Sequence, residues 1–310
     1  MRGVAVRVLA GLFAASWLVL PGFGAIDLSV TWNADWPQVL EAGWGLFSTV
    51  LVGAAFVLVA LRPRDSTPAI VQLVAATAAL AISAVVAQET ELIALVSLLA
   101  IQTYIVDRLR GRASTARAAP SVPRSSRLSR SLLVVAAVGL LPWLTYALHM
   151  WELNRENRFD SDITMGIDHY SVQGALALCL AVLPILAASR REARPFMPVC
   201  VSAAAFYLGL VSFAWPSSPA GLDRGWSAAA MGWAVALLAV TFARHRADRE
   251  TTLPPRILTM STTGSTDSRP RPCQSPATAQ PSPGATERDR PEGSPTRLPV
   301  NGRSAKRGRL

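Results

Sequence analysis

The sequence predicts an all-α membrane protein, a bundle of eight transmembrane helices followed by a disordered C-terminal tail. Three observations lead to this class. Hydrophobic residues make up 51% of the 310-residue chain and charged residues only 16%, whereas an average soluble domain is about 25% charged. The apolar residues are gathered in long runs. The segments between these runs are alternately rich and poor in arginine. An ordinary water-soluble enzyme is therefore excluded.

Eight apolar segments are long enough to span a bilayer. A hydrocarbon core of about 30 Å requires about 20 apolar residues in a helix. Runs such as residues 51–61 are apolar on every side, unlike the alternating strands of a membrane barrel. We therefore expect helices, in which the backbone satisfies its own hydrogen bonds. The expected spans are residues 4–22, 44–62, 68–87, 90–106, 131–150, 171–189, 196–215 and 226–243.

These spans divide the chain into four parts. We expect helices one to four in residues 1–106, a basic cytoplasmic linker in 107–130, helices five to eight in 131–243 and a tail in 244–310. Each set of four helices has the same order of loops, which suggests two four-helix halves related as parallel repeats. Residues 251–310 contain ten of the 22 prolines and bury too little apolar surface to offset the entropy of ordering, so we predict disorder there.

The arginines predict the orientation of the spans. Seventeen of them precede the tail on one side of the membrane, and the other side carries only Arg155, Arg158 and Arg224. Cytoplasmic loops are the arginine-rich ones, so both chain ends are predicted to lie in the cytoplasm. The predicted location is the plasma membrane. The first span resembles a signal peptide, but a cut after Ala25 would leave Phe23 where a small residue is needed, and we expect the span to be retained.

The excess of basic residues predicts contact with lipid. The net charge is +10, and residues 251–310 supply ten basic and four acidic residues of the total. An arginine-rich linker and tail beside the membrane can contact anionic lipid. We expect the bilayer as the main partner and no specific nucleic-acid binding.

The second outer loop, residues 151–170, is the most polar segment between spans. It predicts a ligand-binding patch on the outer face, formed by Asn154, Arg155, Asp160, Asp162, Asp168, His169 and Tyr170. Two imidazoles and nearby carboxylates also suit Zn²⁺ or Cu²⁺, and two histidines can ligate a haem iron. The candidate metal ligands are His149, Glu152, Asp168 and His169.

A purely structural interpretation of this loop is also open. Asp168 or Ser171 can cap the sixth expected helix, and Arg155 and Arg158 can pair with neighbouring carboxylates. The spacing of the histidines matches no known ligand motif, and the chain lacks GxxxxGK[ST], GxSxG, HExxH and GxGxxG. ATP-driven transport by this chain, serine hydrolysis and zincin proteolysis are therefore disfavoured, and no catalytic residue is assigned.

Residues 162–173, DITMGIDHYSVQ, with Asn154 and Arg155 ahead of them, resemble a segment of uncharacterised multi-pass membrane proteins of high-GC Gram-positive bacteria. The resemblance covers residues 150–190, and the alanine- and arginine-rich, lysine-poor composition agrees with it. It implies a plasma-membrane location and carries no activity and no catalytic residue.

The leading functional hypothesis is a non-enzymatic membrane protein, permease-like or part of a membrane complex, with a polar outer patch at residues 149–170. It requires no cofactor, and its small-molecule ligand is unknown. The alternative is a metal- or haem-dependent membrane enzyme that uses His149, His169 and nearby carboxylates. A third possibility is a scaffold whose basic linker and tail hold cytoplasmic partners or anionic lipid.

Overall fold

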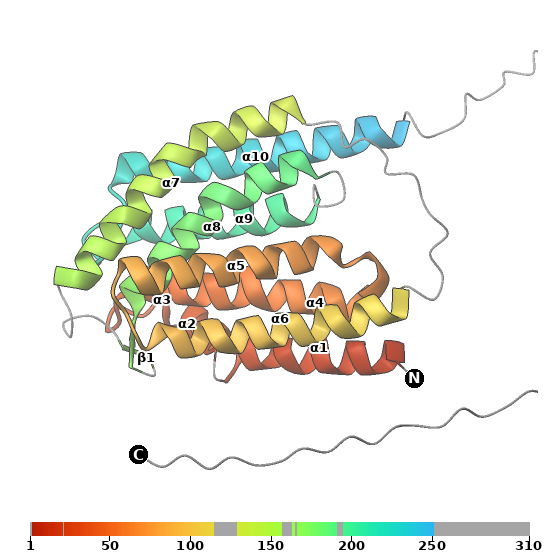
Figure 1. The fold of residues 1–310 in the computed structure, drawn as a ribbon. Helices are drawn as coiled ribbons and strands as arrows, with labels where there is room; N and C mark the ends of the chain where they lie inside the picture. Colours follow the sequence, from red (N-terminus) through yellow and green to blue (C-terminus); the bar gives the residue numbers. More distant parts are fainter. Residues whose placement is uncertain are drawn as a thin grey trace, which may run out of the picture. The chain divides into compact units, whose positions relative to one another are not determined.

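The computed structural model describes residues 2–20, 22–114, 129–156, 163–164, 166–190 and 195–250. They form a helical bundle with one hairpin of two short strands, drawn as a ribbon in Figure 1. The tail predicted to be disordered lies outside the described residues from residue 251 onward, as does most of the predicted basic linker, residues 115–128.

The helices form two runs along the chain, before and after residues 115–128. The first half of the described chain contains α1 (Arg2–Leu18), α2 (Gly24–Val30), α3 (Gln38–Leu46), the π-helix η1 (Phe47–Gly53), α4 (Ala54–Leu61), the 3-10 turn η2 (Pro63–Asp65), α5 (Thr67–Val86) and α6 (Leu92–Ser114). The second contains α7 (Arg130–Glu156), β1 (Ile163–Thr164), β2 (Ile167–Asp168), α8 (His169–Ser189), α9 (Phe196–Ala214) and α10 (Arg224–Glu250).

Seven helices of the described chain are long and apolar enough to cross a membrane, so the structure confirms the all-helical class and is compatible with a membrane protein. They are Gln38–Leu61, Thr67–Val86, Leu92–Gly111, Arg130–Glu156, His169–Ser189, Phe196–Ala214 and Arg224–Ala243. The first expected span is a shorter apolar helix, Gly3–Leu18, so the count of eight stays a prediction. The polar ends of two spans are longer than expected: α6 continues to Ser114 and α10 to Glu250, because arginine is a good helix former in water.

The second span contains a π-helix that the hydropathy pattern did not indicate. The segments α3, η1 and α4 form one continuous helix. A π-turn interrupts the regular pairing of backbone groups, and the side-chain amide Nε2 of Gln72 on α5 donates to the Leu51 carbonyl inside η1 at 2.7 Å. Gln72 is fully buried, so this hydrogen bond ties α5 to the irregular turn.

Helix α8 occupies the centre of the bundle. It packs against α3, α5, α7 and α9, and it lies between α5 and α7 in Figure 1. Small residues allow this close packing: a Cβ atom at Gly174 would lie 2.2 Å from the indole nitrogen of Trp151 on α7. Since α8 contacts helices from both expected halves, the structure gives no support to two separate four-helix units.

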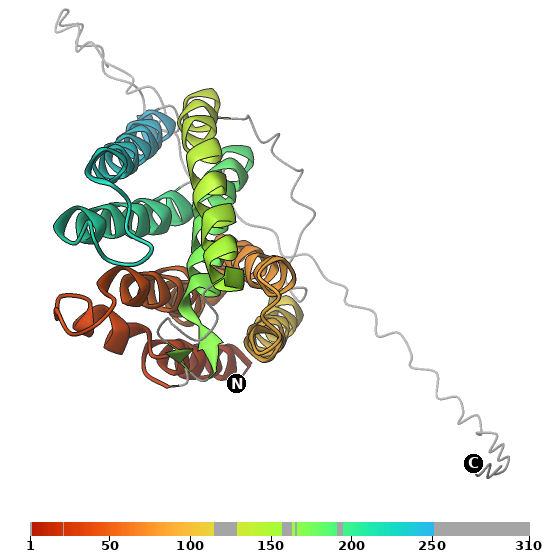
Figure 2. The same ribbon diagram turned by 90° about the vertical axis from the view of Figure 1, so that its left-hand side faces the viewer.

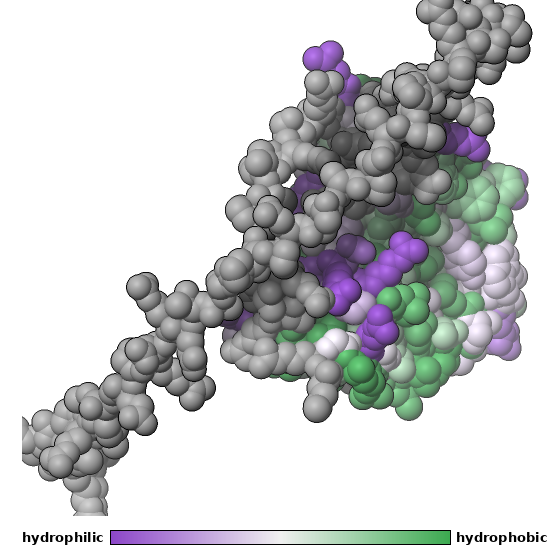
Figure 3. All heavy atoms as spheres, turned by 90° about the vertical axis from the view of Figure 1, so that its right-hand side faces the viewer, coloured by the Kyte–Doolittle hydropathy of each residue, from purple (hydrophilic) through white to green (hydrophobic). Residues whose placement is uncertain are grey.

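The two ends of the bundle differ in polarity. The start of α1, the α4–α5 turn and the end of α6 lie at one end (Figure 1), where Arg62, Arg64 and Arg108 are exposed. Figure 3 looks at this end and shows hydrophilic side chains gathered between hydrophobic flanks. The helix α2 and the β1–β2 hairpin lie at the opposite end, which faces the viewer in Figure 2.

Candidate functional site

The first residues of α8 were predicted to belong to a ligand-binding patch, and the structure gives them a capping role. Asp168 precedes the helix, and its Oδ1 accepts a hydrogen bond from the Tyr170 backbone N–H at 2.9 Å. The Ser171 hydroxyl donates to the Asp168 carbonyl at 2.7 Å. A carboxylate at this position satisfies one of the free N–H groups of the first turn, so the capping interpretation is confirmed for Asp168.

His169 is packed inside the bundle. Its side chain is fully buried, and its ring is stacked on Trp44 of α3, with centroids 4.8 Å apart and planes inclined by 27°. The Trp44 indole N–H donates to the Gly22 carbonyl at 2.7 Å. His169 therefore packs α8 against α3. The sequence had predicted it in an exposed patch on the outer face.

The predicted metal ligands do not converge on a common point. His149 and Glu152 are exposed on α7, whereas Asp168 and His169 are buried. Within the described ranges, no group of three or more histidine, cysteine, aspartate and glutamate side chains is arranged to hold a metal ion. The hypothesis of a metal or haem enzyme thus gains no support from the geometry.

Asn154 and Arg155 connect the C-terminal end of α7 to the end of α5 and the turn between α5 and α6. The Asn154 side-chain Nδ2 lies 3.2 Å from a carboxylate oxygen of Glu89 and 3.3 Å from the Ala87 carbonyl. Arg155 donates to the Val86 carbonyl at 2.9 Å. Two other members of the predicted patch, Asp160 and Asp162, lie outside the described residues.

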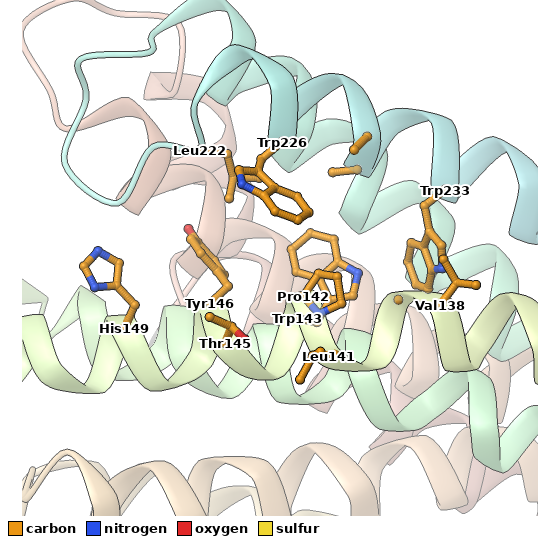
Figure 4. Close-up of a pocket in the computed structure, with 13 residues that line it drawn as sticks. Val138, Leu141, Pro142, Trp143, Thr145, Tyr146, His149, Leu222, Trp226 and Trp233 are labelled. Carbon is orange, nitrogen blue, oxygen red and sulfur yellow. The ribbon is translucent and has the colours of Figure 1, made fainter.

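A cavity of about 560 Å³ lies between α7 and α10, and sequence reasoning did not predict it. Figure 4 shows its lining. His149 stands at one end of the row of side chains, and Val138 and Trp233 stand at the other. The remaining lining residues are Gly139, Leu141, Pro142, Trp143, Thr145, Tyr146, Leu222, Trp226, Ala229 and Ala230. Apart from His149, Tyr146 and Thr145, the lining is apolar or aromatic.

Hydrogen bonds fix side chains toward both ends of the cavity. At one end the Trp233 indole N–H donates to the Val135 carbonyl at 2.8 Å, and the ring lies so close to α7 that a Cβ atom at Gly139 would be 2.4 Å from it. At the other end the Tyr146 hydroxyl donates to the Ala220 carbonyl at 2.7 Å and accepts from Gln173 at 2.8 Å. The cavity lies between these two sets of hydrogen bonds.

The floor and the α10 wall of the cavity explain the open space. Trp143 is buried beneath it, with its ring edge-on to both Tyr146 and Trp233, at centroid distances of 6.1 and 6.0 Å. On α10 the two residues between the tryptophans that line the cavity are Ala229 and Ala230, whose side chains are too small to reach α7. The small side chains of Ala229 and Ala230 therefore leave space between the large rings of Trp226 and Trp233.

Two sequence signals could have pointed to this cavity. Trp226 and Trp233 are seven residues apart, so they lie on the same face of a helix, with alanines between them. Pro142 lies inside the span that faces them. Pro142 has no N–H, so it cannot donate the helical hydrogen bond to the Val138 carbonyl. These signals alone do not predict the cavity, because the pairing of α7 with α10 is not visible in the sequence.

Comparisons of the chain with protein-family models, with curated proteins and with solved structures found no match. The resemblance of residues 150–190 to a bacterial membrane family therefore stays an expectation, and the function is argued from the cavity itself.

Proposed function

We propose that this chain is a non-enzymatic, multi-pass protein of the cell membrane that binds a hydrophobic molecule from the bilayer in the cavity between α7 and α10. The observation that carries the proposal is the cavity: it is mostly apolar, hydrogen bonds fix side chains toward both of its ends, and it lies between two membrane-length helices. Its volume falls within the range of about 300–1,000 Å³ typical of small-molecule sites.

The position of the cavity indicates where its ligand comes from. Of the seven membrane-length helices, α7 and α10 are the least covered by the rest of the bundle, with 28% and 22% of their apolar windows buried. Val138 and Leu141 at the cavity are 66% and 72% exposed. In a bilayer these surfaces face lipid, so a molecule dissolved in the membrane reaches the cavity sideways, without passing through water.

The chemistry of the lining favours binding over catalysis. His149 is the one imidazole that lines the cavity, and the Tyr146 hydroxyl is engaged by both Ala220 and Gln173. A general acid and base, or a nucleophile with its base, require two groups within hydrogen-bond reach. The lining can hold and orient a molecule, which is what a permease-like carrier or a subunit of a membrane complex requires.

The arrangement of the helices supports α1 as an eighth span. A helix of 17 residues is about 25 Å long, close to the hydrocarbon thickness. The Trp17 indole N–H donates to the buried Gln102 side chain of α6 at 2.7 Å, so α1 shields a polar group of α6 from lipid. With eight spans and the arginine-rich end of the bundle facing the cytoplasm, both chain ends lie in the cytoplasm.

Photolabelling tests the proposed binding. The full-length protein in lipid nanodiscs would be irradiated with a long-chain alkyl probe that carries a diazirine, and the labelled peptides identified by mass spectrometry. We expect labels in α7 and α10 at the cavity. Ala229→Leu fills the cavity and should remove most of this label, whereas Ala228→Leu, an equal change at an exposed position outside the lining, should keep it. Equal labelling of the two variants would overturn the proposal.

A further inference from the structure

We infer that the molecule held between α7 and α10 is a phospholipid of the outer leaflet, with one acyl chain in the cavity and its phosphate at the end that carries His149. The inference rests on the proposed binding function and names the class of ligand and its direction. Three features of the cavity carry it: its depth, its width and the uneven distribution of its polar groups.

The depth of the cavity corresponds to a single leaflet. On α7 the lining begins at Val138 and ends at His149, 11 residues later, which is about 16 Å of helix. The hydrocarbon core is about 30 Å thick, so the cavity reaches about half-way across. Its far end is closed by Trp233, which rests against Gly139 and is hydrogen-bonded to Val135. A chain that enters therefore stops near the middle of the membrane.

The width of the cavity admits a thin chain. Its volume of about 560 Å³ extends over a length of about 16 Å. An extended acyl chain in van der Waals contact with Trp143 and the alanines of α10 suits it.

The polar groups of the lining gather at one end. Thr145, Tyr146 and His149 follow one another toward the end of α7 that leads to the second outer loop, and no polar side chain lines the opposite end except the Trp233 indole N–H, which is already engaged. Arg224 begins α10 on the same side, two residues before Trp226. An amphiphile matches this polarity only with its headgroup beside His149 and its chain end beside Trp233.

The headgroup end contains the donors that a phosphate requires. The His149 imidazole and the Arg224 guanidinium are both exposed, and both donate hydrogen bonds to phosphate oxygens. The negative charge of Asp223 is directed to its own helix, where its Oδ1 accepts from the Trp226 backbone N–H at 2.9 Å. In the arginine-based topology this end of the bundle is the outer one, so the lipid belongs to the outer leaflet.

A depth-resolved photolabelling experiment tests the ligand and its direction. Two phosphatidylglycerol probes, one with a diazirine near the acyl carbonyl and one with a diazirine at the chain end, would be built into nanodiscs with the full-length protein. We expect the first to label Thr145 to His149 and the second to label Val138 and Trp233. Labels in the cavity with the order reversed or uniform would overturn this inference and leave the proposed binding intact. An unlabelled cavity would overturn both.

Competition identifies the headgroup. Unlabelled phosphatidylglycerol should displace the probes, and a free fatty acid of equal length should displace them poorly; the opposite order would overturn the assignment to a phospholipid. His149→Leu, which removes the imidazole donor, should weaken retention about fivefold, the effect of one hydrogen bond. Glu152→Gln, exposed on the same helix and outside the lining, is the control and should retain the lipid as the unaltered protein does.

Discussion

Gly139→Ala tests the contact with Trp233 that closes one end of the cavity. The added Cβ atom would lie 2.4 to 2.5 Å from three atoms of the Trp233 indole, Cε2, Cζ2 and Nε1. The ring must therefore move away from α7, and its 2.8 Å hydrogen bond to the Val135 carbonyl is lost. We expect a less stable protein with a distorted cavity.

The size of the effect follows from three contributions. Overfilling a packed site costs about 1–3 kcal/mol, and an interhelical hydrogen bond in a membrane protein contributes about 0.6 kcal/mol. Alanine is favoured over glycine inside a helix by about 0.5–1 kcal/mol, which offsets part of the loss. The free energy of unfolding should therefore fall by about 1–3 kcal/mol.

Thermal denaturation of the detergent-solubilised protein measures this change against a matched control. A Cβ atom at Gly232, on α10, meets nothing within 4 Å, so Gly232→Ala should be neutral or slightly stabilising. Trp233→Phe removes the indole edge that Gly139 faces, and in that background Gly139→Ala should cost little. If Gly139→Ala proved as stable as Gly232→Ala, or if its cost persisted beside Trp233→Phe, the packing described for this contact would be wrong.

Three further predictions concern the bundle around the cavity. Trp17→Phe leaves the buried oxygen of Gln102 without its donor and should lower the free energy of unfolding by about 1–2 kcal/mol, measured by the same denaturation; an unchanged midpoint would argue against α1 as part of the bundle. Asp168→Ala should cost about 1 kcal/mol through loss of the α8 cap, whereas Asp168→Asn, an equally good capping residue, should cost much less; equal losses would contradict the capping role. In intact cells a membrane-impermeant thiol reagent should modify Asp35→Cys and should modify Arg64→Cys only after permeabilisation, and the reverse pattern would invert the proposed topology.

Hydropathy located the membrane helices because transfer into lipid depends on the sum over about 20 residues and hardly on what the helix packs against. The expected span 68–87 corresponds to Thr67–Val86 and the span 171–189 to His169–Ser189. The short helix α2 and the π-turn η1 escaped this approach, because each depends on local packing, such as the hydrogen bond from Gln72 to Leu51.

The candidate site was harder to predict, because a polar residue in sequence carries no sign of how it is satisfied. His169 looked like a surface ligand and is stacked inside the bundle on Trp44. Asn154 looked like part of a binding patch and is bonded to Glu89 and Ala87. His149 does line a cavity, but with α10 as its partner wall, and no pattern along the chain reveals which faces of two distant helices meet.

The π-turn in the second span separates the two parts of that helix. Its wider turn holds one more residue than an α-turn, so the part around Trp44 faces His169 while the part beyond Gly53 is set by its contact with α1. Deleting a single residue within Phe47–Gly53 would restore a regular helix and rotate one part relative to the other by about 100°, one step of a 3.6-residue turn. Gln72 would then lose its acceptor. The second span could keep its contacts to α8 or its contacts to α1, but not both.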